Sequence, residues 1–252
     1  MNWTPFLWLA VSLGVLLLVE RWIHRHLQGT MLLLTGDPEI ALVLYALPLL
    51  PGIVLHELSH ALAAVLLGAR VGGISIRPKL AGQRVQLGFV PVEKTDAVRA
   101  SLIGLAPLLV GSGFILLVGC LAFDIPTVAA ALTTGYPLDA VRGIGRMLDA
   151  PDTWIWAYAI FTVSNTMLPS RADRQAWRPV ILFLLLVVVL IWVAGLGPAI
   201  VEATATTIIA GLHWLAMICA LTVVVDVPFA LAIALAEKLL ERLKGWKVDY
   251  LA

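Results

Sequence analysis

The sequence predicts an α-helical polytopic membrane protein, with about six transmembrane helices and a small β-hairpin between the second and the third. Hydrophobic residues form 61% of the 252-residue chain and charged residues only 13%, whereas a soluble domain is roughly half apolar and a quarter charged. The mean hydropathy is +0.97. We therefore expect a single transmembrane domain over residues 1–252, embedded in the lipid bilayer.

Six apolar segments are long enough to cross a bilayer, or nearly so. The first follows Met-Asn-Trp-Thr-Pro, which lacks the basic flank of a secretory signal peptide, so it is predicted to be a retained span. The second and sixth exceed a simple crossing, which predicts that part of each tilts or projects. The segments are residues 5–22, 40–67, 99–121, 153–170, 179–196 and 204–236, followed by a tail at 237–252.

The connector after the second segment carries the predicted hairpin. Residues 73–77 and 84–87 alternate apolar and polar side chains, and a stretch with Gly and Pro separates them. A strand edge of this kind can hold an extended peptide by β-addition, although a plain covering hairpin fits the pattern equally well.

The distribution of basic residues predicts the orientation. Thirteen of the 17 Lys and Arg residues lie in the 70–99 connector, the 171–178 loop and the tail. Cytoplasmic loops carry the excess of basic residues. A six-span chain in the plasma membrane of a prokaryote, with both termini in the cytoplasm, would place all three regions inside.

The segment His56-Glu57-Leu58-Ser59-His60 lies within the second apolar segment. Positions i and i+4 share one helix face, so both imidazoles can approach one metal ion, and Glu57 lies close enough to serve as general base. Such a string also arises by chance, but ionisable groups inside a membrane span are expensive and are usually functional.

A third ligand must come from elsewhere in the chain. In the predicted topology Asp173, after the fourth segment, arrives on the same side of the membrane as the two histidines. The alternative for Asp173 is a solvated loop acid paired with Arg171 or Arg174. Asp226 and His213, in the last segment, are further candidates because they are ionisable groups within an apolar run.

These segments together resemble the site-2 protease family of intramembrane zinc metalloproteases, whose second motif has the form Asn-x-x-Pro-x-x-x-x-Asp-Gly. The resemblance covers about residues 40–180. It implies that His56, His60 and Asp173 hold one Zn²⁺, that Glu57 activates water, and that Asn165 orients substrate or stabilises the oxyanion.

The second motif departs from the family pattern in three places. Asn165 precedes Pro169 by four residues, one more than usual, and Asp173 follows it by four, one fewer. Arg174 stands where the family has Gly. The departures indicate a divergent branch, and they leave open whether Asn165 or Thr166 takes the role of the family Asn.

The predicted function is an intramembrane zinc metalloendopeptidase that cleaves transmembrane segments of membrane proteins near the cytoplasmic face. The alternative is a non-proteolytic membrane scaffold or assembly protein with a structural or lost metal site. A transporter is disfavoured because inverted repeats are not detected. The net charge of +1, without a basic stripe, does not indicate nucleic acid binding. No segment has the length of a soluble substrate-selecting domain, so selection would come from the membrane core or from a regulatory or substrate-delivering membrane partner.

Overall fold

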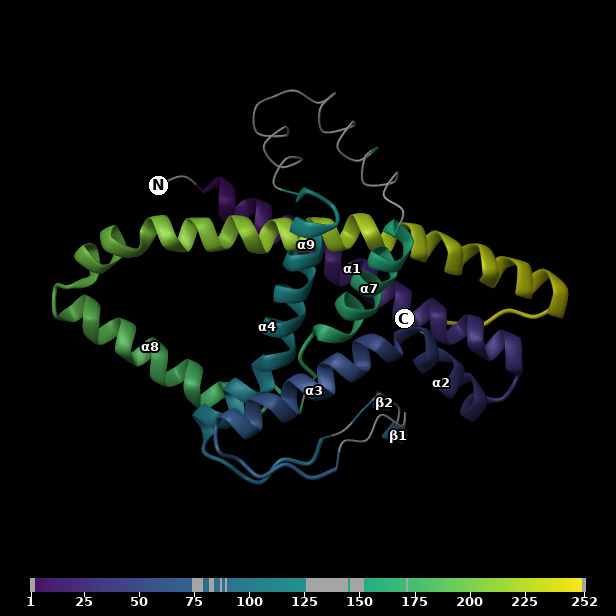
Figure 1. Ribbon diagram of the computed structural model, residues 1–252, viewed down its shortest axis with the longest axis horizontal. Coiled ribbons are helices and arrows are strands. Elements are labelled where there is room, and N and C mark those ends of the chain that lie inside the picture. The colour runs from purple at the N-terminus through teal and green to yellow at the C-terminus, as the bar shows by residue number, and fades with distance from the viewer. Residues whose placement is uncertain are drawn as a thin grey trace.

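The computed structural model describes residues 3–73, 79–81, 84–86, 88, 90–125, 145, 152–170 and 172–250, and most of these residues are helical (Figure 1). Four helical stretches are long and apolar enough to cross a membrane: α1, the run from α2 to α3, α4 and α9. The chain is thus a helical membrane protein. The helices are α1 (Thr4–Thr35), α2 (Pro38–Ala46), the 3₁₀ turn η1 (Leu47–Leu49), α3 (Leu50–Leu66), α4 (Ala97–Leu121), α7 (Thr153–Met167), α8 (Trp177–Val193) and α9 (Gly197–Lys244).

Local signals set several helix ends. Gly36 takes the left-handed conformation (φ 70°) that ends α1. The Asp37 carboxylate then caps α2 by accepting from the backbone N–H groups of Glu39 (2.7 Å) and Ile40 (3.1 Å). Asp96 caps α4 in the same way, and its bonds from the backbone N–H groups of Arg99 and Val98 hold the pKa of this exposed carboxyl below its usual value. These caps separate the apolar segments from one another.

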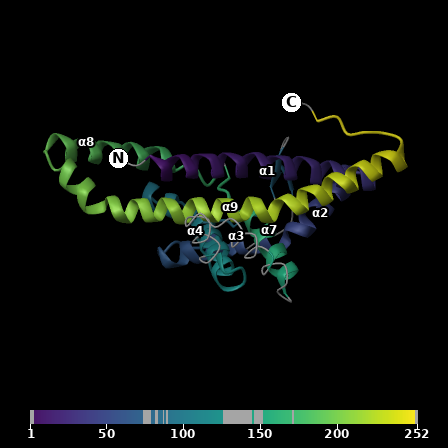
Figure 2. The same ribbon diagram turned by 90° about the horizontal axis from the view of Figure 1, so that it is seen from above.

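Helices α1 and α9 pack side by side along much of their length and run in the same direction (Figure 2). His26 of α1 bonds to Glu237 of α9 at 2.6 Å, and further along both helices Lys244 Nζ donates to the Leu34 carbonyl. The tail folds back, so that the Tyr250 hydroxyl also donates to Glu237. Gly29 makes room for this ring, since a side chain there would collide with it.

This parallel packing bears on the predicted orientation. The first and last spans of a six-span chain run antiparallel, whereas α1 and α9 run parallel. If both helices cross the membrane, their C-terminal ends emerge on one face and the chain termini lie on opposite faces. The prediction that both termini are cytoplasmic therefore does not fit this pair. Helix α9, at about 1.5 Å per residue, is also much longer than one crossing requires.

Helices α3, α4 and α7 form a compact group against one side of the α1–α9 pair (Figures 1 and 2). Glycines permit the closest approaches within it. A side chain at Gly52 would meet the Thr162 carbonyl of α7, and one at Gly111 of α4 would meet Met167. The buried core around Ile53, Ile115 and Ile160 joins these helices to α1 and α9. This group carries the candidate site.

Helix α8 differs from the others because none of its residues is buried. Helix α8 begins beside α4 and runs away from it, and the chain then turns back as α9. Helices α8 and α9 therefore form a wedge that is closed at the turn between them (Figure 1). The apolar surface of α8 suits contact with lipid.

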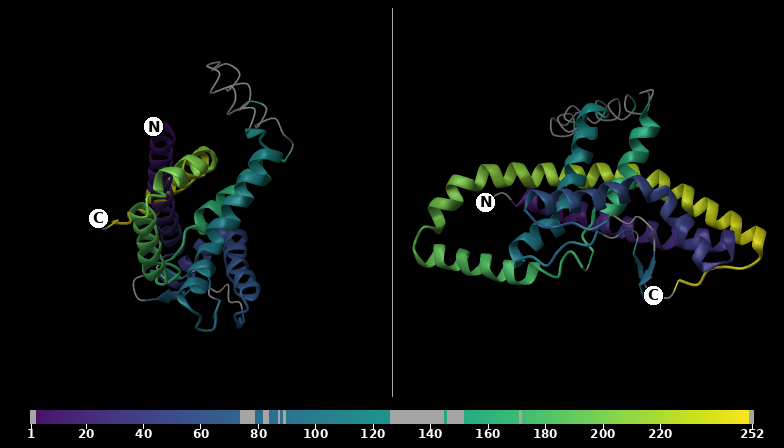
Figure 3. Two further views of the ribbon diagram at one scale, coloured as in Figure 1. Left: turned by 90° about the vertical axis from the view of Figure 1, so that its left-hand side faces the viewer. Right: turned by 60° about the horizontal axis from the view of Figure 1, so that its bottom comes forward.

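The connector between α3 and α4 runs along α3 (Figure 3). It contains two short antiparallel strands, β1 (Lys79–Ala81) and β2 (Arg84–Gln86), and a bridge between Val71 and Val92. The second predicted strand overlaps β2. Most of the first predicted strand, residues 74–77, lies outside the described residues, as do residues 82–83 between β1 and β2.

Candidate metal centre

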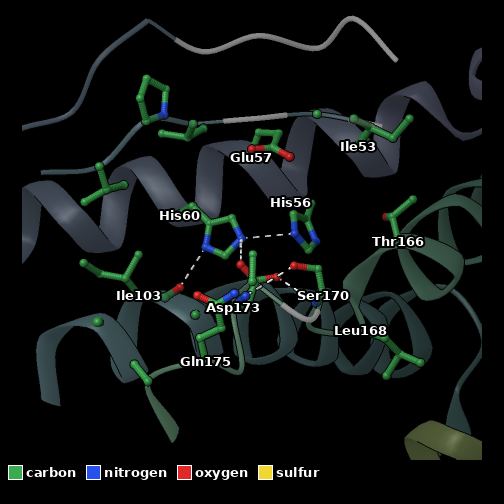
Figure 4. Close-up of a pocket in the computed structure, with 18 of the residues that line it drawn as sticks. Ile53, His56, Glu57, His60, Ile103, Thr166, Leu168, Ser170, Asp173 and Gln175 are labelled. Atoms are coloured by element: carbon green, nitrogen blue, oxygen red, sulfur yellow. Dashed lines mark hydrogen bonds and ion pairs between the residues drawn. The ribbon is translucent and has the colours of Figure 1, made fainter. Parts of the chain in front are cut away.

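The two histidines of α3 converge as their spacing predicts. His56 and His60 project from the same side of the helix, and their Nε2 atoms lie 3.1 Å apart (Figure 4). His60 is buried and His56 is half-buried. Two imidazole nitrogens this close can bind one ion without any change of the backbone.

A hydrogen bond at its other ring nitrogen orients His60. Nδ1 donates to the Ile103 carbonyl of α4 at 2.8 Å. The proton is therefore on Nδ1, and the Nε2 lone pair faces His56 and Asp173. Bonds of this kind fix the tautomer and raise the basicity of a metal ligand.

Asp173 completes the group from the loop between α7 and α8. Its Oδ1 lies 3.3 Å from His60 Nε2, and its Oδ2 accepts from the Ser170 N–H at 2.7 Å. One ligand atom from each of His56, His60 and Asp173 lies within 4.8 Å of the others. Arg174 does not pair with Asp173 among the described contacts, since its Nε donates to the Ser170 carbonyl at 3.2 Å. Arg171 lies outside the described residues.

Glycine in α4 permits the loop to approach the histidines. A side chain at Gly104 would lie 2.3 Å from the Asp173 carbonyl oxygen. The neighbouring residue, Ile103, supplies the carbonyl that holds His60. One turn of α4 therefore positions both the loop and a histidine.

Glu57 projects from the adjacent face of α3, toward the connector (Figure 4). It is buried (6% exposed) and interacts electrostatically with Asp173. The backbone of Gly88 passes so close that a side chain there would lie 2.4 Å from Glu57 Oε1. Glu57 is thus held between the connector and α3.

All four residues line one cavity of about 1410 Å³. This exceeds the usual 300–1,000 Å³ of a small-molecule pocket, so it has room for water and a peptide segment. Its walls come from α1, α2, α3, α4, α7, the loop after α7 and the end of the connector, and they include Glu20, His24, Tyr45, Val92 and Asn165.

The remaining predicted residues do not belong to the ligand group, although Asn165 and Thr166 line the same cavity. The Asn165 amide donates to the Phe161 carbonyl (2.9 Å) and to Asp226 Oδ1 (3.3 Å), and the Thr166 hydroxyl bonds within its own helix. Asp226 therefore joins Asn165 rather than the histidines, and His213 is exposed on α9. Among the described residues, Asp173 is the carboxylate that meets both histidines.

Several positioning groups were not predicted from the sequence. The Ile103 carbonyl and the Ser170 N–H are backbone atoms, and no side-chain pattern marks them. Gly88 and Gly104 carried no signal in the sequence for these contacts. Comparisons with protein-family models, curated proteins and solved structures find no match to this chain.

Proposed function

We propose that this protein is an intramembrane zinc metalloendopeptidase that cleaves transmembrane segments of membrane proteins. The observation that carries the proposal is the meeting of His56, His60 and Asp173 within 4.8 Å, beside Glu57 and inside a helical membrane protein. Two imidazoles and one carboxylate are the ligand set of a catalytic zinc site with an open position.

The donor set suits zinc in its details. The hydrogen bonds to Ile103 and from Ser170 leave His60 Nε2 and Asp173 Oδ1 facing each other. Zinc bound there would polarise the scissile carbonyl and acidify a water molecule. Magnesium and calcium prefer all-oxygen ligands, so they suit this set less well.

The residues of the chain would supply the rest of the reaction. Glu57 takes a proton from the attacking water and passes it to the leaving amine as the peptide C–N bond breaks. Burial between the connector and α3 holds its carboxylate beside the cavity. Asn165 lines the same cavity, and its predicted role in orienting the peptide or stabilising the developing oxyanion would require its amide to release the bond to Phe161 or to Asp226.

Substrate would bind in extended form, because a helix in lipid hides its peptide bonds. Around the Val71–Val92 bridge, the Gly72 N–H bonds to the Pro91 carbonyl (2.8 Å) and the Glu93 N–H to the Arg70 carbonyl (3.0 Å). In this pairing the N–H and C=O of Val92 point away from residues 70–72. Val92 lines the cavity, so its free edge supports β-addition of an unwound segment.

The site would face the cytoplasm of a prokaryotic cell. The two connectors that flank it hold Arg70, Lys94, Arg99, Arg174 and Arg178, and cytoplasmic loops are enriched in basic residues. The six predicted spans correspond to α1, the run from α2 to α3, α4, α7, α8 and α9, and because α1 and α9 run parallel, one of the two short helices, α7 or α8, would not cross the membrane completely.

The alternative is a membrane scaffold that retains a structural metal or none. It is favoured by Arg174, which stands where the family motif has Gly, and by the shifted spacing around Pro169. The enzyme hypothesis requires the Glu57 carboxylate for cleavage, whereas the scaffold hypothesis does not require it.

The decisive test uses detergent-purified protein and a reporter whose transmembrane segment separates two tags. We expect about one zinc per wild-type chain, lost in His56→Ala and Asp173→Ala and retained in the exposed-histidine control His213→Ala. Glu57→Gln should keep its zinc and lose cleavage of the reporter. The matched control Glu202→Gln, which changes an exposed acid on α9, should cleave normally. Zinc binding with cleavage that survives Glu57→Gln would overturn the enzyme proposal, and full zinc retention in Asp173→Ala would overturn the ligand set.

A further inference from the structure

A second polar cluster lies buried between α1, α7 and α9. It consists of Glu20 (4% exposed), Ser164 (0%), Asn165 (5%) and Asp226 (0%). Burying a charge without a compensating partner is costly, and within a membrane protein such groups are usually functional. This cluster shares no residue with the histidine centre.

The hydrogen bonds within the cluster fix the Asn165 amide. Its Nδ2 donates to the Phe161 carbonyl at 2.9 Å and to Asp226 Oδ1 at 3.3 Å. The carbonyl oxygen Oδ1 must then point the other way, and it is buried without a hydrogen-bond partner among the described residues. The only other donor to Asp226 in the described contacts is the Ser164 hydroxyl, at 3.2 and 3.5 Å.

Glu20 brings a second carboxylate to the same place. Glu20 lies on α1, which packs along α9, and it lines the same cavity as Asn165. Glu20 and Asp226 interact electrostatically. Glu20 Oε1 is also buried without a partner in the described part of the chain. Acceptor oxygens thus outnumber donors, and the cluster lacks positive charge.

The cluster can be reached from the metal centre. Glu20 and Asn165 line the same cavity as His56 and Asp173. Water and ions that enter this cavity would reach two buried acceptor oxygens at its far end. His24 also lines the cavity, but its Nδ1 is already bonded to the Tyr45 hydroxyl at 2.6 Å.

We propose that Glu20 and the carbonyl oxygen of Asn165, with Asp226 behind them as the second negative charge, bind a hard divalent cation at a site separate from the histidine centre. Carboxylate and amide oxygens are the ligands that Ca²⁺ and Mg²⁺ prefer. Two carboxylates carry two negative charges, and a divalent ion balances both where a monovalent ion leaves one uncompensated. The site does not depend on the proposed protease activity, because it would bind its ion whether or not Glu57 is catalytic.

Thermal unfolding of the full-length protein in detergent, with zinc supplied at one per chain, tests the site. Unfolding is followed by tryptophan fluorescence while Ca²⁺ or Mg²⁺ is titrated, with Na⁺ at matched ionic strength as reference. A ligand that binds only the folded state raises Tm. We expect a saturable rise of several °C in wild type and in Glu202→Gln, an exposed acid on α9, and no rise in Glu20→Gln or Asp226→Asn.

Four results would overturn the proposal. No rise with either divalent ion in wild type would mean that protons neutralise the acids, and a rise with Na⁺ alone would exclude a divalent site. A rise that persists in Glu20→Gln and Asp226→Asn would place the ion elsewhere. If these variants do not fold, equilibrium dialysis with radioactive Ca²⁺ decides: wild type should bind one ion per chain, and Asn165→Ala, which keeps both carboxylates, should bind it at least about tenfold more weakly. Equal Ca²⁺ binding by wild type and Asn165→Ala would contradict the proposed site.

Discussion

The two buried polar clusters solve the same physical problem in different ways. The histidine centre is built largely from neutral rings, and the backbone groups of Ile103 and Ser170 hold His60 and Asp173. The Glu20–Asp226 cluster consists of acids and leaves Glu20 Oε1 and Asn165 Oδ1 without hydrogen-bond partners among the described residues.

The histidine centre is thus preorganised for a metal, whereas the Glu20–Asp226 cluster needs an ion to balance its negative charge. Two neutral imidazoles can stay apart from a metal at modest cost because they carry no charge, although His56 Nδ1 is buried without a hydrogen-bond partner among the described residues. Two carboxylates in an apolar environment cannot both stay ionised without compensation. We therefore expect the first cluster to control metal affinity and catalysis, and the second to control stability.

The largest effect is expected from Asp173→Asn. Asparagine keeps an oxygen that can accept the Ser170 N–H, so the loop stays in place while the ligand charge is lost. Losing an outer partner of a metal ligand costs 10–100-fold in affinity, and losing the ligand itself should cost more than about 100-fold. Competition with a zinc chelator measures the affinity, with Asp152→Asn, an exposed acid at the start of α7, as control. Unchanged affinity would remove Asp173 from the site.

Gly88→Ala tests whether Glu57 is a base held in position. The new methyl group would lie 2.4 Å from Glu57 Oε1, so the carboxylate must move. A misplacement of about 1 Å can cost 10²-fold in rate. We expect cleavage of the reporter to fall by roughly that factor with zinc content unchanged. Gly73→Ala, in the same connector with nothing within 4 Å, should retain full activity. Equal activity in the two variants would mean that Glu57 does not act as the base.

Gly104→Ala probes the approach of the Asp173 loop to α4. The methyl group would lie 2.3 Å from the Asp173 carbonyl oxygen, and this backbone atom can yield only if the loop shifts. We expect zinc affinity to fall about 10–100-fold, the range found when an outer support of a ligand is lost. Gly113→Ala, on the same helix with open space around it, is the control. A loss shared by both variants would point to the helix rather than to the loop.

Sequence reasoning predicted the parts of the fold and site that depend on local spacing. The i, i+4 rule brought His56 and His60 together, and each apolar segment overlaps at least one of the described helices. Asp173 required a topological argument and a family resemblance, and the structure places it beside the histidines. Zinc binding itself stays a prediction.

What depends on packing between distant segments could not be predicted. The parallel alignment of α1 and α9 is set by contacts such as His26 with Glu237, which lie 211 residues apart. Glu20 was not predicted as a functional residue because it lies near the end of an apolar segment, where an acid usually faces water. Only the alignment of α1 with α9 shows that it meets Asp226.

The smallest effect tests the donor shortage in the acidic cluster. Ser164→Ala removes one of the two described side-chain donors to Asp226, and a buried acceptor left unsatisfied costs about 1–3 kcal/mol. The control is Thr222→Val, one turn before Asp226, because that buried hydroxyl bonds only to the Ile218 carbonyl of its own helix in the described contacts. We expect a lower Tm for Ser164→Ala than for Thr222→Val without divalent ions, and a smaller gap at saturating Ca²⁺, when the ion rather than the hydroxyl offsets the charge. If the two variants have the same Tm without Ca²⁺, or if Ca²⁺ leaves their difference in Tm unchanged, the acids of this cluster are already neutral. The contrast between the two clusters would then be one of geometry alone.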